Sequence, residues 1–154
     1  DRAVNRAEFT AMLVRSLALP IVSTDSGFSD VDANAWYAGV IATAAEYGLV
    51  NGYSDGTFRP QKTITREEIA AMVVRAAAFA GENISVTSSE QQRLLGGYQD
   101  AGKIKWGHQE IAAAIKAGIV QGTSATTLRP DANATRAQAA AMILRYLEYV
   151  GFID

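Results

Sequence analysis

One short motif occurs three times in this chain and limits what the chain can fold into. Its copies begin at Asn5, Thr65 and Thr135, and each has an arginine in second place and a glutamate or glutamine in fourth place. This pattern is typical of a capping box, in which the first side chain accepts a hydrogen bond from the N–H three residues on. The fourth side chain accepts one from the N–H of the first residue. The sequence therefore predicts three α-helices that begin in the same way.

The agreement between the copies continues along the predicted helices, which we expect at about residues 6–17, 66–79 and 136–149. A methionine follows each motif arginine by six residues, and a second arginine follows it by nine. The offset is 60 residues from the first copy to the second and 70 from the second to the third. Such self-similarity is typical of a repeat protein, in which neighbouring units stack to bury their apolar faces.

A second element occurs twice between the copies. Residues 28–31 and 98–101 are predicted to be short extended segments, and a tryptophan, Trp36 or Trp106, follows each of them. Each tryptophan is expected to begin a helix. We expect the first of these helices to run to about residue 47, with a polar residue before it as the cap and Gly48 as its left-handed end.

Glycine-rich turns follow both tryptophan helices and end in an arginine-proline pair. The second turn has Ala125 and Thr126 where the first has Asp55 and Gly56, so the two turns are not assumed to share one shape. The polar stretch at 81–97 is interpreted as an insertion. The expected organisation is an all-α globular unit with its motif helices in a central three-helix bundle. Its parts are a first repeat with only the motif helix at 1–27, a second repeat at 28–81, an insert or linker at 82–97 and a third repeat at 98–154.

The composition excludes several classes of protein. A net charge of −2 leaves no broad basic surface for nucleic acid, and no apolar run is long enough to cross a membrane. The chain has no cysteine, and its one histidine, His108, has only Glu110 nearby as a possible partner, so we expect no enzyme activity. Residues 30–34 look like the start of a calcium loop, but Ala35 and Ile41 replace its required glycine and glutamate. We therefore expect no metal and no cofactor.

These motifs resemble the S-layer homology family, the repeated cell-wall-binding modules of bacterial surface-layer proteins and surface-attached enzymes. The resemblance is carried by residues 28–31 with Trp36, by the run from Gly48 to Pro60 and by residues 64–68, Ile-Thr-Arg-Glu-Glu. It implies a pseudo-threefold array of helix-loop-helix repeats. It also implies noncovalent anchoring outside the cell, to the wall of a Gram-positive-type bacterium, through a secondary cell-wall polysaccharide that bears a pyruvate ketal.

This chain departs from the family pattern at three points. Asn5 stands where the family usually has threonine, and Gln138 stands where it usually has glutamate. The first repeat has no tryptophan helix of its own. Two alternatives follow: the chain is a fragment whose first repeat is truncated, or its third groove is incomplete or finished by another molecule.

A pyruvylated sugar presents a carboxylate on an apolar ring, so its receptor needs a cation, backbone donors and an aromatic wall. An arginine at a helix start supplies the first two. Its guanidinium can bind a carboxylate through two hydrogen bonds, and the N–H groups of the first turn point the same way. We expect such sites in grooves between consecutive repeats. The candidate ligand-binding residues are Arg6, Arg66, Arg136, Gly52, Gly122, Trp36, Trp106, Tyr53, Ser54 and Asp55.

Other interpretations of these residues stay open. The motif arginines can pair instead with a carboxylate or a loop carbonyl, and the resemblance favours ligand contact for Arg66 and Arg136 over Arg6. Both tryptophans begin apolar stripes, so we expect core packing before sugar stacking. We expect solvent or ion pairs around the arginines nine residues along, which are Arg15, Arg75 and Arg145. The alternative function is a structural module for surface-layer self-assembly or protein docking, with other surface-layer subunits as partners and no sugar bound.

Overall fold

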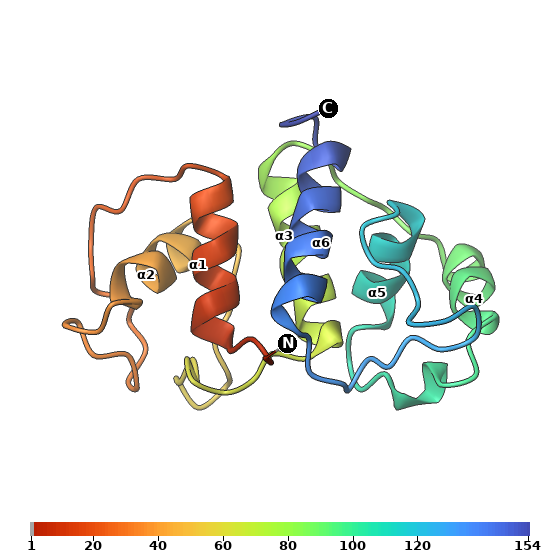
Figure 1. Ribbon diagram of the computed structural model, residues 1–154, viewed down its shortest axis with the longest axis horizontal. Helices are drawn as coiled ribbons and strands as arrows, with labels where there is room; N and C mark the ends of the chain where they lie inside the picture. Colours follow the sequence, from red (N-terminus) through yellow and green to blue (C-terminus); the bar gives the residue numbers. More distant parts are fainter. Residues whose placement is uncertain (1) are drawn as a thin grey trace.

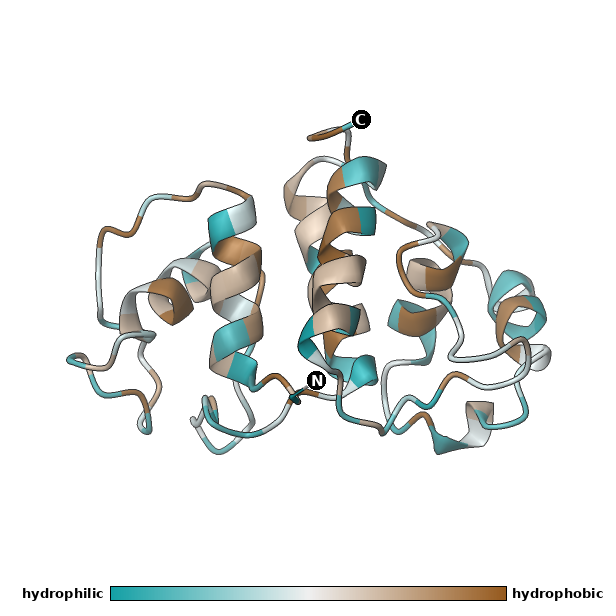
Figure 2. Ribbon diagram, viewed as in Figure 1, coloured by the Kyte–Doolittle hydropathy of each residue, from teal (hydrophilic) through white to brown (hydrophobic). Residues whose placement is uncertain are grey.

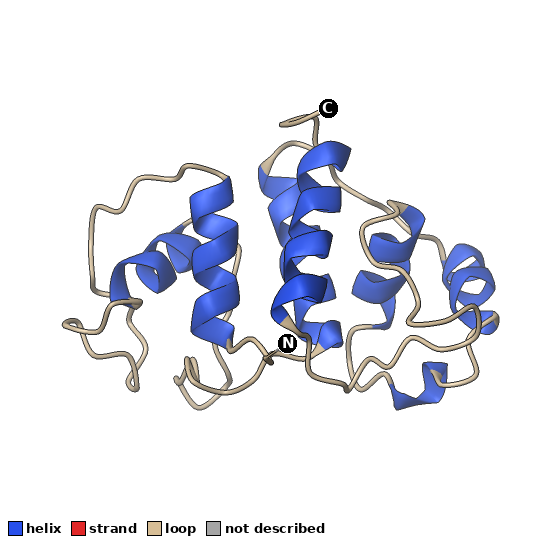
Figure 3. Cartoon of the chain, viewed as in Figure 1, coloured by secondary structure: helices blue, strands red, loops and turns tan. Residues whose placement is uncertain are grey.

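The computed structural model describes residues 2–154, and within them it contains helices and loops but no extended strand (Figure 1, Figure 3). The prediction of an all-α protein is confirmed. No helix among the described residues is long and apolar enough to cross a bilayer. In chain order the elements are α1 (Arg6–Ser16), α2 (Ala38–Glu46), α3 (Arg66–Phe79), α4 (Ser88–Gly96), a 3-10 turn η1 (Ala101–Lys103), α5 (His108–Lys116) and α6 (Arg136–Tyr149).

The three predicted capping boxes are present at the starts of α1, α3 and α6. The side chains of Asn5, Thr65 and Thr135 each accept a hydrogen bond from the N–H three residues on. The glutamate or glutamine at that position accepts one from the N–H of the cap residue. These hydrogen bonds satisfy donors that a helix start otherwise leaves free, which is why the same motif gives the same helix start three times.

A closed ring of hydrogen bonds joins the three helix starts. The N–H of Val4 donates to the Ala134 carbonyl at 3.0 Å, Ala134 donates to Ile64 at 3.1 Å, and Ile64 donates back to Val4 at 2.9 Å. All three side chains are buried. Residues 60 and 70 positions apart are thereby held at one end of the molecule, and α6 packs against both α1 and α3 (Figure 1).

The remaining helices cover two of the three motif helices. α2 packs against α1 and α5 packs against α3, with α4 on the outer side of α5 (Figure 1). Apolar residues recur along the helices and hydrophilic residues gather at helix ends and in loops (Figure 2). The fully buried side chains include Phe9, Leu13, Ile69, Val73 and Tyr146.

The predicted start of the first tryptophan helix is wrong. α2 begins two residues after Trp36, and Tyr37 caps it without a side-chain hydrogen bond. Asp32, a candidate cap, instead accepts from the N–H of Asn34 at 2.9 Å and so folds the loop before the helix. The predicted left-handed end is confirmed, because Gly48 has a φ of +73°.

Sequence reasoning missed helix α4, which lies inside the stretch interpreted as an insertion. Thr87 and Glu90 form a fourth capping box at its start. Lys116 of α5 pairs with the Glu90 carboxylate at 2.8 Å, and this contact ties α4 to the rest of the molecule. The signal was present in the sequence, since Thr87 and Glu90 have the same spacing as the three motif copies.

Candidate ligand-binding grooves

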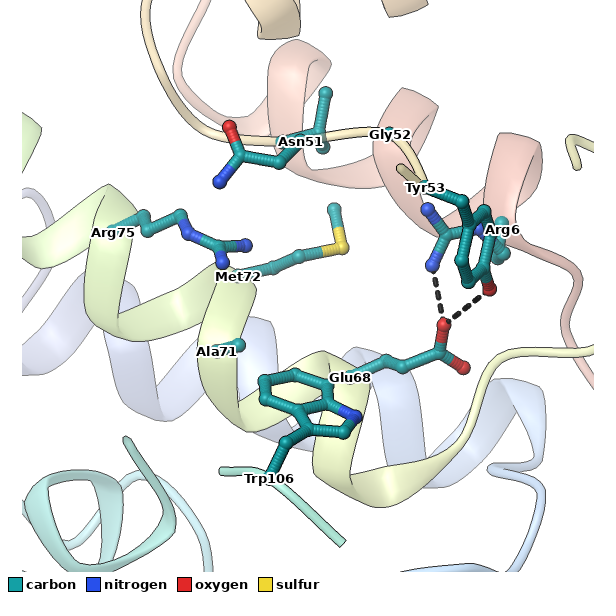
Figure 4. Close-up of a pocket in the computed structure, with 10 residues that line it drawn as sticks. Arg6, Asn51, Gly52, Tyr53, Glu68, Ala71, Met72, Arg75 and Trp106 are labelled. Atoms are coloured by element: carbon teal, nitrogen blue, oxygen red, sulfur yellow. Dashed lines mark hydrogen bonds and ion pairs between the residues drawn. The ribbon is translucent and has the colours of Figure 1, made fainter. Parts of the chain in front are cut away.

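Three small grooves lie between successive motif helices. Groove 1 has a volume of about 200 Å³ and lies between the start of α1, the turn at 50–53 and α3 (Figure 4). Groove 2, also about 200 Å³, lies between Arg66, the turn at 121–123 and α6. Groove 3, about 160 Å³, lies between Arg136, α1 and Trp36. Pockets for drug-sized ligands are about 300–1,000 Å³, so each groove is smaller than such a pocket.

The grooves are built in one register. Each combines the motif arginine of one helix with four residues of the next, which lie two, five, six and nine positions after that helix's own arginine. In groove 1 these are Glu68, Ala71, Met72 and Arg75; in groove 2, Gln138, Ala141, Met142 and Arg145; in groove 3, Glu8, Ala11, Met12 and Arg15. The shared spacing of the methionines and second arginines therefore corresponds to shared positions in the grooves.

Arg6 is buried at the edge of groove 1, and neighbouring groups engage its guanidinium. Its Nε donates to the Phe58 carbonyl at 2.8 Å, and one terminal nitrogen pairs with Glu68. The guanidinium carbon lies 4.8 Å from the ring centre of Tyr53 and 4.6 Å from that of Phe58. These contacts correspond to the carboxylate and carbonyl pairing that the sequence left open as an alternative.

Glu68 joins several parts of groove 1. It accepts a hydrogen bond from the Tyr53 hydroxyl at 2.9 Å and one from the N–H of Thr65 at 3.0 Å, in addition to its ion pair with Arg6 (Figure 4). Burial by itself raises the pKa of the Glu68 carboxyl. The Thr65 N–H and the positive charges of Arg6 and Lys62 outweigh burial, so this pKa lies below its usual value.

Arg66 occupies the matching position in groove 2, and its hydrogen-bond partners within residues 2–154 are carbonyls. Its Nε donates to Leu128 at 2.9 Å and a terminal nitrogen donates to Gln121 at 2.7 Å. Gln138 stands where groove 1 has Glu68, so among the described residues that line groove 2 no carboxylate faces this arginine. Burial and the positive charges of Arg129 and Arg145 lower the pKa of Arg66. In groove 3, by contrast, Arg136 is exposed.

The backbone donors at the starts of α1 and α3 are not free, contrary to expectation. The N–H groups of Arg6 and Ala7 donate to the carbonyls of Lys62 and Pro60, each at 2.9 Å. In α3 the first two N–H groups donate in the same way, to the carbonyls of Ala132 and Pro130. The capping side chain takes the next donor in both helices. A ligand carboxylate can therefore meet an arginine there but no unpaired helix-start N–H, because the turn of the neighbouring repeat already fills that place.

The expectation that both tryptophans pack in the core is also wrong. Trp36 is 59% exposed and lines groove 3, while Trp106 is 52% exposed and lines groove 1. Both residues precede their helices, α2 and α5, by two positions, so neither lies on the buried stripe. In groove 3 the guanidinium of Arg15 lies 5.9 Å from the centre of the Trp36 ring. Both indole rings are available to a ligand.

Glu67 holds Trp106 in place, and sequence reasoning missed it. This carboxylate is 3% exposed and accepts hydrogen bonds from the N–H groups of Lys105, Trp106 and Gly107, at 3.1, 2.8 and 2.7 Å. It thus caps α5 from another helix, since Gly107 has no side chain to do so. In the first motif copy Ala7 occupies this position. The only sequence signal was a second acidic residue in one copy of the motif.

The candidate glycines have a packing reason. A Cβ on Gly52 would lie 2.3 Å from the ring of Phe28, and one on Gly122 would lie 2.4 Å from the Ser124 carbonyl. Both residues line grooves, 1 and 2 respectively. Tight closure of the turn, rather than ligand approach, is what requires glycine at these two positions.

The two glycine-rich turns close in the same way despite their different sequences. The N–H of Tyr53 donates to the Thr57 carbonyl at 2.8 Å, and Thr123 donates to Thr127 at 2.9 Å. Ser54 and Asp55 lie at the exposed tip of the first turn and do not line groove 1. Asp55 accepts a hydrogen bond from the N–H of Thr57 at 3.0 Å. A ligand contact by Ser54 or Asp55 stays a prediction.

The prediction that residues 28–31 and 98–101 are extended is wrong, because both segments form turns in which the N–H of Val31 donates to the Phe28 carbonyl and that of Ala101 to the Tyr98 carbonyl, each at 3.3 Å. An aspartate in each of these segments fastens the glycine-rich turn that follows. Asp30 accepts hydrogen bonds from the N–H groups of Phe58 and Arg59, both at 2.8 Å. Asp100 does the same for Leu128 and the next residue, also at 2.8 Å. The acidic residues that looked like part of a calcium loop therefore have a structural role. No group of three or more acidic, histidine or cysteine side chains in the described part of the chain is placed to hold a metal ion.

Comparison with known proteins identifies this arrangement. The sequence profile of the S-layer homology domain matches residues 27–70 and 97–140, which carry both tryptophan helices, both glycine-rich turns and two of the three motif arginines. The chain belongs to the S-layer homology family. The resemblance drawn from the motifs is thereby confirmed.

Several relatives of this S-layer homology chain are much longer proteins. An amylopullulanase of Thermoanaerobacterium thermosulfurigenes is 37% identical over 99% of this chain, which covers 8% of that protein. The surface-layer 125 kDa protein of Lysinibacillus sphaericus is 32% identical over 97% of the chain, which covers 12% of it. A cellulosome-anchoring protein of Acetivibrio thermocellus is 32% identical over 96% of the chain, which covers 33% of it. The chain thus corresponds to a small part of each relative.

Proposed function

We propose that this S-layer homology module anchors a longer protein to a bacterial cell wall by binding a wall polysaccharide in its inter-repeat grooves. The observation that carries the proposal is groove 1, where cations, a tyrosine and an exposed tryptophan line one small cavity. The relatives support it, since a similar region occurs in an amylopullulanase, a surface-layer protein and a protein named for anchoring. Because the names of these relatives differ while the matched region is shared, we infer a common anchoring role and assign no catalytic role to the module.

The ligand that groove 1 suits best is an anionic terminal sugar, and we infer the pyruvylated sugar of a secondary cell-wall polysaccharide. The indole of Trp106 offers an apolar face for a sugar ring, and arginines supply the positive charge for a carboxylate. The volume of the groove fits a chain end, where such a substituent is accessible. The site of action is the outer surface of a Gram-positive-type bacterium.

We also infer that the module is pseudo-threefold, with one motif helix from each of residues 1–27, 28–81 and 98–154 and an insert at 82–97. The closed hydrogen-bond ring of Val4, Ile64 and Ala134 supports this arrangement, as does the common register of the grooves.

Calorimetric titration with a synthetic pyruvylated disaccharide tests the proposed function, and the same disaccharide without the pyruvate ketal is the control. We expect saturable binding of the pyruvylated form and none of the control. Binding to neither sugar by folded protein would contradict the proposal and would favour the alternative of a structural or docking module. In that case analytical ultracentrifugation with other surface-layer subunits is the next measurement.

A further inference from the structure

The two arginines that line groove 1 differ in how far the protein itself satisfies them. Arg6 has a carbonyl and a carboxylate as partners, so its positive charge is offset inside the protein. Arg75 also lines this groove, from α3. Among residues 2–154 no hydrogen bond or ion pair engages its guanidinium. We propose that Arg75, rather than Arg6, binds the anionic group of the ligand in groove 1, an inference that rests on the proposed function.

The surroundings of Arg75 favour an added anion. The side chain is half-buried between the apolar residues that line the groove, and its guanidinium lies across Met72 from the cluster of Arg6, Tyr53 and Glu68 (Figure 4). Burial lowers the pKa of Arg75 despite the negative charge of Glu110, and the positive charge of Arg6 lowers it further. A half-buried cation whose nitrogens face solvent gains more from a carboxylate than a cation already paired, because it gives up water rather than a hydrogen bond within the protein.

Arg6 is then a positioning residue. Its hydrogen bond to the Phe58 carbonyl holds the glycine-rich turn against α1, and its ion pair holds Glu68, which in turn accepts from the Tyr53 hydroxyl. The chain Arg6–Glu68–Tyr53 fixes one wall of groove 1. The opposite side then has the anion-binding guanidinium of Arg75, with Trp106 as the floor on which a sugar ring lies (Figure 4).

The repeats offer matched controls for this inference. Arg145 has the same place in groove 2, and Arg15 has it in groove 3. Neither groove combines its arginine with both a tyrosine from the turn and a tryptophan, since groove 3 has Trp36 without a turn and groove 2 has a turn without a tryptophan. The tight binding of an anionic sugar therefore belongs to groove 1.

The test compares Arg75→Gln, Arg75→Lys, Arg145→Gln and Arg15→Gln with the unchanged protein in calorimetric titrations with the pyruvylated disaccharide. We expect Arg75→Gln to weaken binding about 10- to 100-fold, as the loss of a charge-assisted hydrogen bond does. Arg75→Lys keeps the positive charge but cannot bind a carboxylate through a bidentate hydrogen bond, so it should weaken binding less than Arg75→Gln does. Both control variants should weaken binding less than Arg75→Gln does, because their grooves lack the combination of a turn tyrosine and a tryptophan. Thermal midpoints should change little, because among residues 2–154 Arg75 has no hydrogen bond or ion pair to lose and only the more distant attraction of Glu110.

Each other outcome has a defined meaning. Equal binding by Arg75→Gln and the unchanged protein would overturn the assignment to Arg75 and leave the proposed function standing. A larger loss in Arg145→Gln than in Arg75→Gln would overturn the assignment to groove 1. If the unchanged protein does not bind the pyruvylated probe, the proposed function fails and this inference fails with it.

Discussion

Grooves 1 and 2 share one backbone plan and differ in how the buried arginine is compensated. In both grooves the motif arginine donates its Nε to the carbonyl two residues before a proline, Phe58 in one and Leu128 in the other. In groove 1 it also pairs with Glu68, whereas in groove 2 the residue in that place is Gln138 and the second acceptor is a carbonyl. The difference between acid and amide thus changes how the buried arginine is compensated, while its Nε hydrogen bond to the turn stays the same.

The same difference extends to the walls of the grooves. Groove 1 has Tyr53 and Trp106, while groove 2 has Thr123 at the place of the tyrosine and no aromatic residue among the described residues that line it. The comparison teaches that repeated motifs preserve the frame of a site more faithfully than its chemistry. The frame depends on backbone hydrogen bonds that most side chains permit, and the chemistry depends on a few individual side chains.

The largest expected effect is on the free energy of unfolding, and it differs between substitutions of Glu68 and Gln138. Glu68→Ala leaves the guanidinium of Arg6 buried without its carboxylate, and breaking such a pair costs about 3–5 kcal/mol of unfolding free energy. Gln138→Ala removes the same half of a capping box without breaking an ion pair, so it should cost about 1 kcal/mol or less. Urea denaturation of both variants measures the difference. Equal costs would show that the ion pair adds nothing to groove 1.

A smaller effect is expected at Glu67, which has no acidic counterpart in α1. Glu67→Ala leaves three backbone N–H groups at the start of α5 without their acceptor and should cost about 1–3 kcal/mol. It should also release Trp106 from its position. Acrylamide quenching of tryptophan fluorescence in a Trp36→Phe background measures this release. Unchanged quenching would mean that other contacts place Trp106.

Tyr146, on α6, provides a substitution outside groove 1. Its buried hydroxyl donates to the Ala76 carbonyl at 2.8 Å and links α6 to α3, and burial raises the pKa of this tyrosine to about 12. Tyr146→Phe removes one hydrogen bond and should cost about 0.5–1.5 kcal/mol in thermal or urea unfolding. Because the variant leaves groove 1 intact, its affinity for the pyruvylated disaccharide should not change. A loss of that affinity would show that the two grooves are coupled through α3.

The smallest expected effect is the pH dependence of stability that arises from Glu68 in groove 1. The pKa of Glu68 is lower in the folded protein than its usual value of 4.5. The folded state therefore favours the ionised carboxylate, and the stabilisation is present above pH 4.5 and lost as the pH falls through the lowered pKa. Urea midpoints measured from pH 6 downward should fall less steeply in Glu68→Gln than in the unchanged protein. If the urea midpoints of the two proteins fall in parallel with pH, the loss of stability in acid is due to other carboxylates.

The helix starts could be predicted because their causes are local. A capping box needs residues only three positions apart, and the same box at Thr87 would have located α4 had its spacing been applied to the whole chain. The prediction of where α2 begins failed because no such local signal exists there. Its start has no side-chain cap, so nothing in the neighbouring sequence marks it.

The candidate site was predicted only in outline. The motif arginines, the glycines, Tyr53 and both tryptophans do line grooves. The arginines nine residues along were expected in solvent or in ion pairs, and they also line grooves: Arg15 is exposed as expected, whereas Arg75 and Arg145 are half-buried. Periodicity shows which helix face a residue occupies and does not show whether another repeat covers that face. Trp36 and Trp106 were misplaced for a related reason, since each lies two residues before its helix and follows no helical period.

The sequence by itself determined the family, the all-α class and the common start of three helices, because these follow from patterns within a few residues of each other. The tertiary structure alone decided the partner of each buried charge. Arg6 meets Phe58 and Glu68, which lie 52 and 62 positions away along the chain. Such contacts depend on how the repeats close into a ring, and no local pattern records that closure.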